Sequence, residues 1–168
     1  AINHMAAIHK GKSIDTMPIN MFYTKAICLD FSNKDLEELI DPFEIETALK
    51  KHRLNIEKGS TVLFYTDHYR KHFNTKNWPK GPGLSIASAE YLAKQKIVAF
   101  GVETMSPGVP GISNKTIHHI CGEYGFTHYE NLVNLHKLIG RGSFRFIGLP
   151  LKIRGGTGSP VRAVAVFE

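Results

Sequence analysis

Short apolar runs that alternate with helical segments constrain the fold of this chain more than any other feature. Residues 26–31, 61–66 and 97–102 are apolar, rich in β-branched and aromatic side chains, and have the length of buried strands. Strands separated by stretches long enough for a helix are typical of α/β proteins with a sizeable sheet. The sequence therefore predicts an α/β or mixed α+β fold, in which helices flank a central and mostly β core.

Capping signals place helices between these runs. Asp41, Pro42 and Glu44 give an N-cap, a proline at the first helical position and the acid of a capping box. We expect this helix to end near Arg53 or Leu54. Ser85 has the side chain and position to cap a second helix before the run at 97–102.

Two further strands are predicted at 143–149 and 161–167, on either side of a glycine-rich segment at 154–160. Such a segment can cradle a phosphate when a helix N-terminus follows it. Because a strand follows here, we interpret the segment as a turn between strands.

Length and composition fit one globular domain spanning residues 1–168. Hydrophobic residues make up 42% of the 168 residues and charged residues 21%, which are ordinary values. The net charge of +6 comes without a block of like charges, so it fits a small anionic substrate as well as a nucleic acid. Ala1 stands where an initiator methionine would be, and we expect the domain to be incomplete at its N-terminus.

Cysteine use and hydropathy suggest where the protein works. Cys28 and Cys121 are separate and form no Cys-x-x-Cys pair, so we predict reduced thiols and a cytoplasmic protein. No apolar run approaches the ~18 residues of a membrane span, and no signal peptide opens the sequence. We expect no membrane partner.

The stretch 114–135 holds the strongest candidate for chemistry. A predicted helix carries His118 and His119, glycines end it, and a β-like run then leads to Glu130. The helix climbs about 9 Å from His118 at ~1.5 Å per residue, and the following run returns about 13 Å at ~3.3 Å per residue. A reversal between the two elements would bring an imidazole and a carboxylate together, as a divalent metal requires. The alternative is a surface helix with two solvated histidines.

The segment 67–83 is long for a loop in a compact domain, and it interleaves lysines with Tyr69, Phe73 and Trp78. This pattern suits a loop that covers a substrate or contacts a second subunit. It also suits a single-stranded nucleic-acid surface, but no recognised nucleic-acid module surrounds it, so we expect no nucleic-acid partner. A cysteine hydrolase built on Cys121 is disfavoured, because a helical cysteine of this kind more often packs in the core.

Several motifs together resemble the metal-dependent cyclase family that includes bacterial kynurenine formamidase and isatin hydrolase. The segment 101–106 resembles a Gly-Ile-Asp-Thr-x-Ser turn, and His118 precedes Glu130-Asn131-Leu132 by the spacing of a metal-ligand pair. The segments 149–153 and 155–163 resemble the C-terminal signature, and 11–15 resembles the piece after the N-terminal metal motif. The resemblance spans nearly the whole chain and implies a swivelling β/β/α fold.

This resemblance implies a hydrolase that uses Zn²⁺ or Mn²⁺ to cleave a C–N amide bond in a small aryl-formamide or cyclic amide, as in tryptophan catabolism. It makes His118 and Glu130 metal ligands and His4 the acid–base catalyst, with His9 as the alternative register for His4 and His119 for His118. It also implies a homo-oligomer, a dimer or tetramer. Aromatic side chains would wall the substrate: Phe22, Tyr23, Tyr69 and Trp78.

Departures from the family pattern weaken parts of this implication. Glu103 stands where aspartate is usual, and Asp67-His68 follows Thr66 where the family has Gly-Trp, which leaves the substrate open. The first metal motif reads His-x-Gly-Thr-His-x-Asp-x-Pro-x-His, and only its tail, ending at His4, is present. Two ligands are too few for a tight site, so we expect the chain to bind metal weakly or not at all. A non-catalytic relative that binds a ligand or partner is the alternative function.

Overall fold

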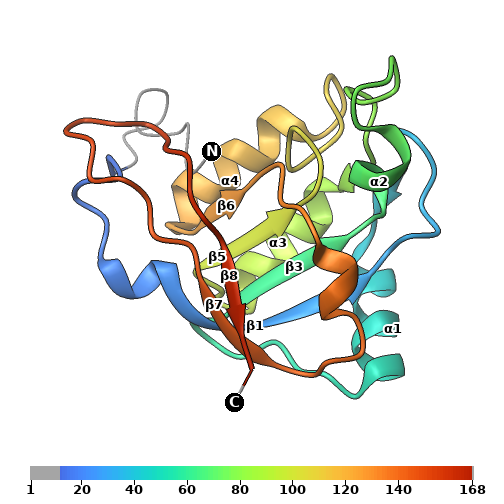
Figure 1. The fold of residues 1–168 in the computed structure, drawn as a ribbon, viewed down its shortest axis with the longest axis horizontal. Coiled ribbons are helices and arrows are strands. Elements are labelled where there is room, and N and C mark those ends of the chain that lie inside the picture. The colour runs from blue at the N-terminus through green and yellow to red at the C-terminus, as the bar shows by residue number, and fades with distance from the viewer. Residues whose placement is uncertain (1–11, 168) are drawn as a thin grey trace.

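The computed structural model describes residues 12–167, and it is built around a six-stranded mixed sheet (Figure 1). The strand order is β6-β5-β3-β1-β7-β8. Strands β6, β5, β3 and β1 are parallel to one another, β7 is antiparallel to β1, and β8 is antiparallel to β7. The bounds are β1 (Tyr23–Asp30), β3 (Thr61–Tyr65), β5 (Ala99–Val102), β6 (Thr127–Tyr129), β7 (Phe144–Ile147) and β8 (Val164–Val166).

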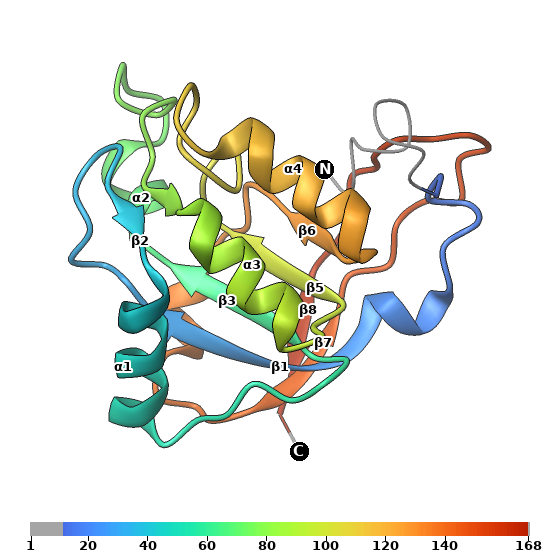
Figure 2. The same ribbon diagram turned by 180° about the vertical axis from the view of Figure 1, so that it is seen from behind.

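Three helices cover one face of this sheet, as Figure 2 shows: α1 (Pro42–His52), α3 (Ile86–Lys94) and α4 (Asn114–Tyr124). Shorter elements complete the fold: α2 (His68–His72), the 3₁₀ helices η2 (Ile19–Phe22) and η3 (Leu135–Leu138), and a two-stranded sheet of β2 (Leu39–Ile40) and β4 (Gly83–Leu84). No helix within residues 12–167 is long and apolar enough to cross a membrane. The arrangement confirms the predicted fold class, a central mixed sheet flanked by helices.

The alternation of side chains along each strand divides the core into two halves. Ile27 and Leu29 of β1 pack with Phe100 on the helix-covered face. Cys28 of β1 and Leu63 of β3 point to the opposite face and pack in a second cluster. Because the central parallel strands are buried on both faces, they are apolar almost throughout, which made them recognisable in the sequence.

The predicted helix ends are found in the structure. Asp41 and Glu44 form the capping box at the start of α1, and Arg53 ends that helix in a left-handed conformation with φ 52°. Ser85 caps α3 by accepting a hydrogen bond from the Ser88 backbone N–H, 3.2 Å away. Gly125 ends α4 with φ 73°, a backbone conformation that favours glycine.

The prediction of one long loop over residues 67–83 is wrong in detail. It contains α2 and ends in β4, with turns between them. Helix α2 has five residues, too few to show an apolar period, and aromatic contacts with the rest of the segment accompany it. Strand β1 also begins earlier than predicted, at Tyr23, because it pairs there with β7 from far along the chain.

Acidic residues follow the parallel strands at one edge of the sheet. Asp67 comes shortly after β3, Glu103 directly after β5, and Glu130 directly after β6. The outside of the carboxyl ends of parallel strands is the usual place for ligands in α/β proteins. This edge is therefore the first place to look for a functional site.

Candidate metal centre

Helix α4 and strand β6 form the scaffold of the candidate site. Ile117, Ile120 and Cys121 bury one face of α4 against the sheet. The left-handed turn at Gly125 reverses the chain, and its N–H donates to the Cys121 carbonyl at 2.9 Å. Strand β6 then runs back beside α4, which places the start of the helix next to the end of the strand.

Three side chains converge where β6 ends. His118 Nε2 lies 4.0 Å from Glu130 Oε1, and His128 Nε2 lies 3.2 Å from the same oxygen. One ligand atom from each residue falls within 4.8 Å of the others. The structure therefore brings together His118 and Glu130, as the helix and strand rises predicted, and adds His128, which the sequence analysis did not include.

The surroundings keep His118 in the form that binds a metal. Its Nδ1 lies 2.8 Å from the Asn114 carbonyl oxygen one helical turn earlier, so Nδ1 carries the proton and Nε2 faces Glu130. Burial lowers the pKa of His118, and the Asn114 carbonyl and the Glu130 carboxylate oppose that shift. The imidazole is consequently neutral at neutral pH.

The donor set fits a divalent ion. Two imidazole nitrogens and one carboxylate are the ligands of many catalytic zinc sites, which keep a fourth position open, and the same donors suit manganese. The side chains of His118 and Glu130 are 15% and 6% exposed, so the charge of an ion there would be partly shielded from water. His118, His128 and Glu130 would hold it, or His118 and Glu130 alone.

Cys121, His128 and Glu130 contact one another in that order, but Cys121 is not available as a nucleophile. Its sulfur lies 3.9 Å from His128 Nδ1, and His128 in turn contacts Glu130. The residue is 1% exposed, and burial raises the pKa of the thiol. A neutral, enclosed thiol cannot attack a substrate, which agrees with the sequence-based preference against a cysteine hydrolase.

The predicted aromatic wall is divided between two edges of the sheet. Tyr69 and Trp78 lie at the carboxyl edge, where Trp78 packs edge-on against Tyr69 with ring centroids 5.8 Å apart. Phe22 is buried at the end of η2, and Tyr23, the first residue of β1, is 52% exposed. Strand register offsets Tyr23 from Glu130 by about 20 Å along the strand direction, at ~3.3 Å per residue. The structure therefore does not bring Phe22 and Tyr23 to the cluster.

The remaining sequence-based candidates are not in the cluster. His119 follows His118 on α4, but it is absent from the group of converging ligand atoms within residues 12–167. His4 and the alternative His9 lie outside the described residues, so the acid–base role of His4 stays a prediction. The sequence analysis missed His128. The one signal for it was its position two residues before Glu130, because side chains two residues apart on an extended chain lie on the same face.

The residues that depart from the family pattern have structural partners. Glu103 Oε2 accepts hydrogen bonds from the backbone N–H and the hydroxyl of Thr66, at 2.9 and 3.1 Å. His68 is buried, and its ring stacks on Trp78 with centroids 5.2 Å apart. Its Nε2 also contacts the Trp78 carbonyl at 2.9 Å. His68 therefore holds the 67–83 segment where the family has a tryptophan.

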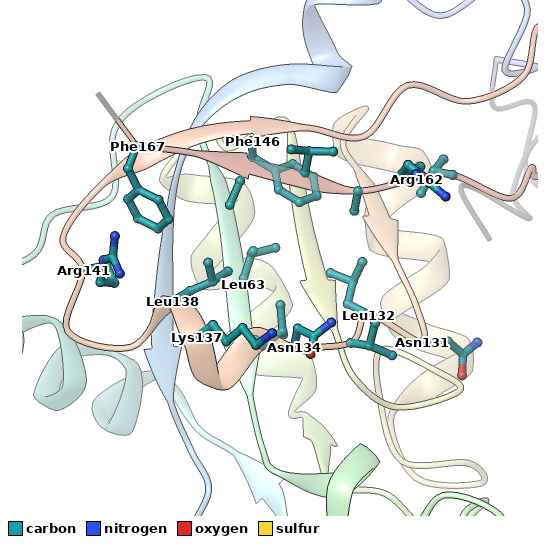
Figure 3. A pocket seen from close by; sticks show the side chains of 16 residues that line it. Leu63, Asn131, Leu132, Asn134, Lys137, Leu138, Arg141, Phe146, Arg162 and Phe167 are labelled. Carbon is teal, nitrogen blue, oxygen red and sulfur yellow. The ribbon is translucent and has the colours of Figure 1, made fainter.

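A cavity of about 590 Å³ opens on the face of the sheet opposite the helices (Figure 3). Leu63, Leu132 and Phe146 line it, with Lys137 and Arg162 among its polar residues. Asn131, the residue after Glu130, lines the cavity, but His118, His128 and Glu130 do not. The cavity and the cluster are thus separate features on different faces of β6.

Residues 1–109 match the model of the family described as "Putative cyclase". The chain belongs to the cyclase family. This match covers β1, β3 and β5 and ends before the cluster on α4 and β6.

Individual relatives of this chain carry hydrolase names. It is 28% identical over 157 residues to a kynurenine formamidase of Bacillus cytotoxicus, covering 92% of this chain and 68% of that protein. It is 34% identical over 98 residues to the isatin hydrolase of Roseibium aggregatum, covering 52% of this chain and 35% of that one.

Solved structures confirm the fold. An isatin hydrolase bound to the product analogue thioisatinate superposes with a TM-score of 0.86 at 25% identity, covering 98% of this chain and 69% of that one. Isatin hydrolase A from Labrenzia aggregata, bound to benzyl benzoate, gives a TM-score of 0.87 at 23% identity, covering 99% and 72%.

Proposed function

We propose that this cyclase-family chain is a metal-dependent hydrolase that cleaves the C–N bond of an aryl formamide or a cyclic aryl amide. The observation that carries the proposal is the convergence of His118 and Glu130, with His128 beside them, at the carboxyl end of β6. The names of the relatives support an amide substrate. A formamidase cleaves a formamide, and isatin is a cyclic amide with its nitrogen on an aromatic ring.

His118 and Glu130 have different tasks in the proposed centre. The Asn114 carbonyl fixes the ring of His118 so that Nε2 faces the centre. The carboxylate of Glu130 supplies the negative charge that a divalent cation requires. When bound, Zn²⁺ or Mn²⁺ would polarise the scissile carbonyl and lower the pKa of a water molecule.

The aromatic residues at the same edge support an aryl substrate. Tyr69 stacks on Phe73 with centroids 4.7 Å apart, and Phe73 packs edge-on against Trp78 at 5.4 Å. These rings could offer an apolar surface to an aromatic leaving group. We further propose that His4 protonates the departing aniline nitrogen, for which the pKa of an imidazole is well matched.

The test begins with the purified protein. Its intact mass and its metal content by plasma emission are measured on one sample, before and after incubation with Zn²⁺ or Mn²⁺. We expect weak uptake of at most about one ion per chain, because two or three protein ligands are fewer than the four of a tight site. Hydrolysis of an N-formyl aniline and of a cyclic aryl amide is then measured on the loaded sample.

Substitutions assign the activity to the cluster. His118→Gln and Glu130→Gln should each lower metal affinity by more than about 100-fold and abolish hydrolysis, because each removes a ligand. His119→Gln is the matched control on the same helix and should change neither property. If His118→Gln and Glu130→Gln fold normally and keep metal content and hydrolysis, the proposal is wrong.

A second function, ligand binding without catalysis, is favoured by the cavity in Figure 3. Its wall is largely apolar, and all its charged residues among those described are cationic: Lys137, Arg141 and Arg162. This combination suits a small apolar anion. Absence of metal and of hydrolysis in the wild-type protein, together with binding of such an anion, would favour this function over the first.

A further inference from the structure

His128 is enclosed between a thiol and a carboxylate. It is fully buried on β6, with Cys121 Sγ 3.9 Å from Nδ1 and Glu130 Oε1 3.2 Å from Nε2. Its ring stacks on the buried Phe100 with centroids 5.6 Å apart, and the edge of His118 lies 4.8 Å away. Close packing on these sides leaves the imidazole no room to turn without displacing the core.

The two histidines of the cluster have different partners on their second ring nitrogens. A histidine that binds a metal nearly always donates its other N–H to a carbonyl, a carboxylate or water. His118 follows this rule, because its Nδ1 faces the Asn114 carbonyl at 2.8 Å. His128 does not, because its Nδ1 faces the sulfur of Cys121, which is a weak acceptor.

Of the two neutral tautomers of His128, the one with its proton on Nε2 suits both contacts, because the carboxylate of Glu130 can only accept. With Nδ1 bare, the ring accepts from the Cys121 thiol, a weak donor, and Nε2–H donates to Glu130 Oε1. A carboxylate has about four lone-pair sites, so Glu130 can accept this bond and still bind a cation. We propose that His128 is a positioning residue that orients the Glu130 carboxylate through Nε2–H, and not a third metal ligand.

This inference rests on the proposed metal centre and states which residues would form it. His118 and Glu130 would be the ligands within the described residues, and His128 would hold Glu130 in place. Burial makes the role effective, because a hydrogen bond to a charged group in the dry interior is stronger than one in water. Because the His128 ring already holds the Glu130 side chain, less side-chain entropy is lost when Glu130 binds a cation.

Two substitutions separate a positioning role from a ligand role. His128→Gln keeps an N–H donor toward Glu130 but removes the imidazole, whereas His128→Phe keeps the ring that stacks on Phe100 and removes the donor. Affinity for Zn²⁺ is measured by calorimetry, and Co²⁺ is added because its visible spectrum reports the ligand set. We expect His128→Phe to weaken Zn²⁺ binding by about 10–100-fold, and His128→Gln to stay within about threefold of wild type with the same Co²⁺ spectrum.

Other outcomes would overturn the inference. Equal losses in the two variants with an altered Co²⁺ spectrum would make His128 a ligand, and unchanged affinity in both would remove any role for it. Failure of the wild-type protein to take up either ion would overturn the proposed function itself, and this role with it. Circular dichroism establishes that each variant is folded.

Nuclear magnetic resonance of the wild-type protein gives an answer even if a variant does not fold. The nitrogen shifts of the His128 ring, in the Zn²⁺-loaded protein, distinguish a protonated nitrogen from a bare one. A proton on Nε2 and a bare Nδ1 would support the positioning role. A proton on Nδ1 with the metal on Nε2 would overturn it.

Discussion

At the scale of single residues, Glu103 is the most unusual group in the described part of the chain. It is 1% exposed, and its Oε1 is buried without a hydrogen-bond partner among the described residues. Burial raises the pKa of this carboxyl group, and hydrogen bonds from Thr66 and from the His68 backbone oppose the shift only in part. A buried, incompletely paired carboxyl group makes folding depend on its protonation.

We predict that Glu103→Gln removes a specific pH dependence of stability. A folded-state pKa above the ordinary value of 4.5 means that the contribution of Glu103 is complete below that pH and is lost as the pH rises through the folded-state pKa. The free energy of unfolding of the wild type should therefore fall relative to that of the variant as the pH rises above about 4.5. Urea unfolding of both proteins at each pH measures the difference, and a constant difference would contradict the prediction.

Single residues differ in how well the sequence could predict them. His118 and Glu130 were predictable, because the rise per residue of a helix and of a strand fixes how far the chain climbs and returns. His128 and the orphan oxygen of Glu103 were not, because both depend on packing across the sheet and against α4. The position of His128 beside Cys121 is set by the reversal at Gly125, whose geometry the sequence only suggests.

At the scale of elements, the start of α1 depends on a buried lysine. Lys34 Nζ lies 2.7 Å from Glu38 Oε1, 2.8 Å from Glu44 Oε1 and 2.7 Å from the Leu39 carbonyl oxygen. Glu44 also accepts from the Asp41 N–H in the capping box. Burial alone would lower the pKa of Lys34, but the hydrogen bonds that it donates to the two glutamates raise it.

We predict that Lys34→Met destabilises the protein by about 1–3 kcal/mol, because it leaves partly buried acceptors unpaired at the entry to α1. Lys25→Met is the matched control. Lys25 lies 2.6 Å from Glu57, but these side chains are 48% and 55% exposed, so its loss should cost less than about 1 kcal/mol. Chemical unfolding measures both variants. Equal effects would show that burial does not distinguish the two ion pairs.

Elements with local signals were predictable and those without them were not. Helices α1 and α3 follow from Asp41 and Ser85, whose side chains satisfy backbone N–H groups that any helix leaves unpaired. Helix α2 has no such signal, and Asp67 at its start has φ 59°. The stacking of His68 on Trp78 ties α2 to residues ten positions away, and this contact cannot be inferred from a period.

At the scale of the whole molecule, the class of the fold was predictable but its strand order was not. Apolar runs separated by helices imply a largely parallel sheet, and β6, β5, β3 and β1 form it. The antiparallel addition of β7 and β8 depends on pairings such as Tyr23 with Ile147, more than a hundred residues apart. The site at the carboxyl edge follows from the parallel part, which is why the predicted pair was found together.

The free edge of the sheet leads to a prediction about assembly. Among residues 12–167, strand β8 pairs with β7 alone, and its Val164 and Val166 are 42% and 40% exposed. Leu151 and Ile153, on the segment that leads to β8, are also exposed, at 59% and 45%. An edge strand with apolar side chains is a template for pairing with another chain, and monomeric proteins usually protect it with charges.

We therefore predict that the protein forms a homo-oligomer through β8. The double variant Val164→Lys/Val166→Lys should shift it toward the monomer, because two lysines would meet their counterparts across the edge and desolvating them is costly. Ile112→Lys is the control, since Ile112 is 61% exposed in the loop before α4, away from β8. Light scattering coupled to size-exclusion chromatography measures the molar mass. A monomeric wild type, or an oligomer that survives the double variant, would show that β8 is not the interface.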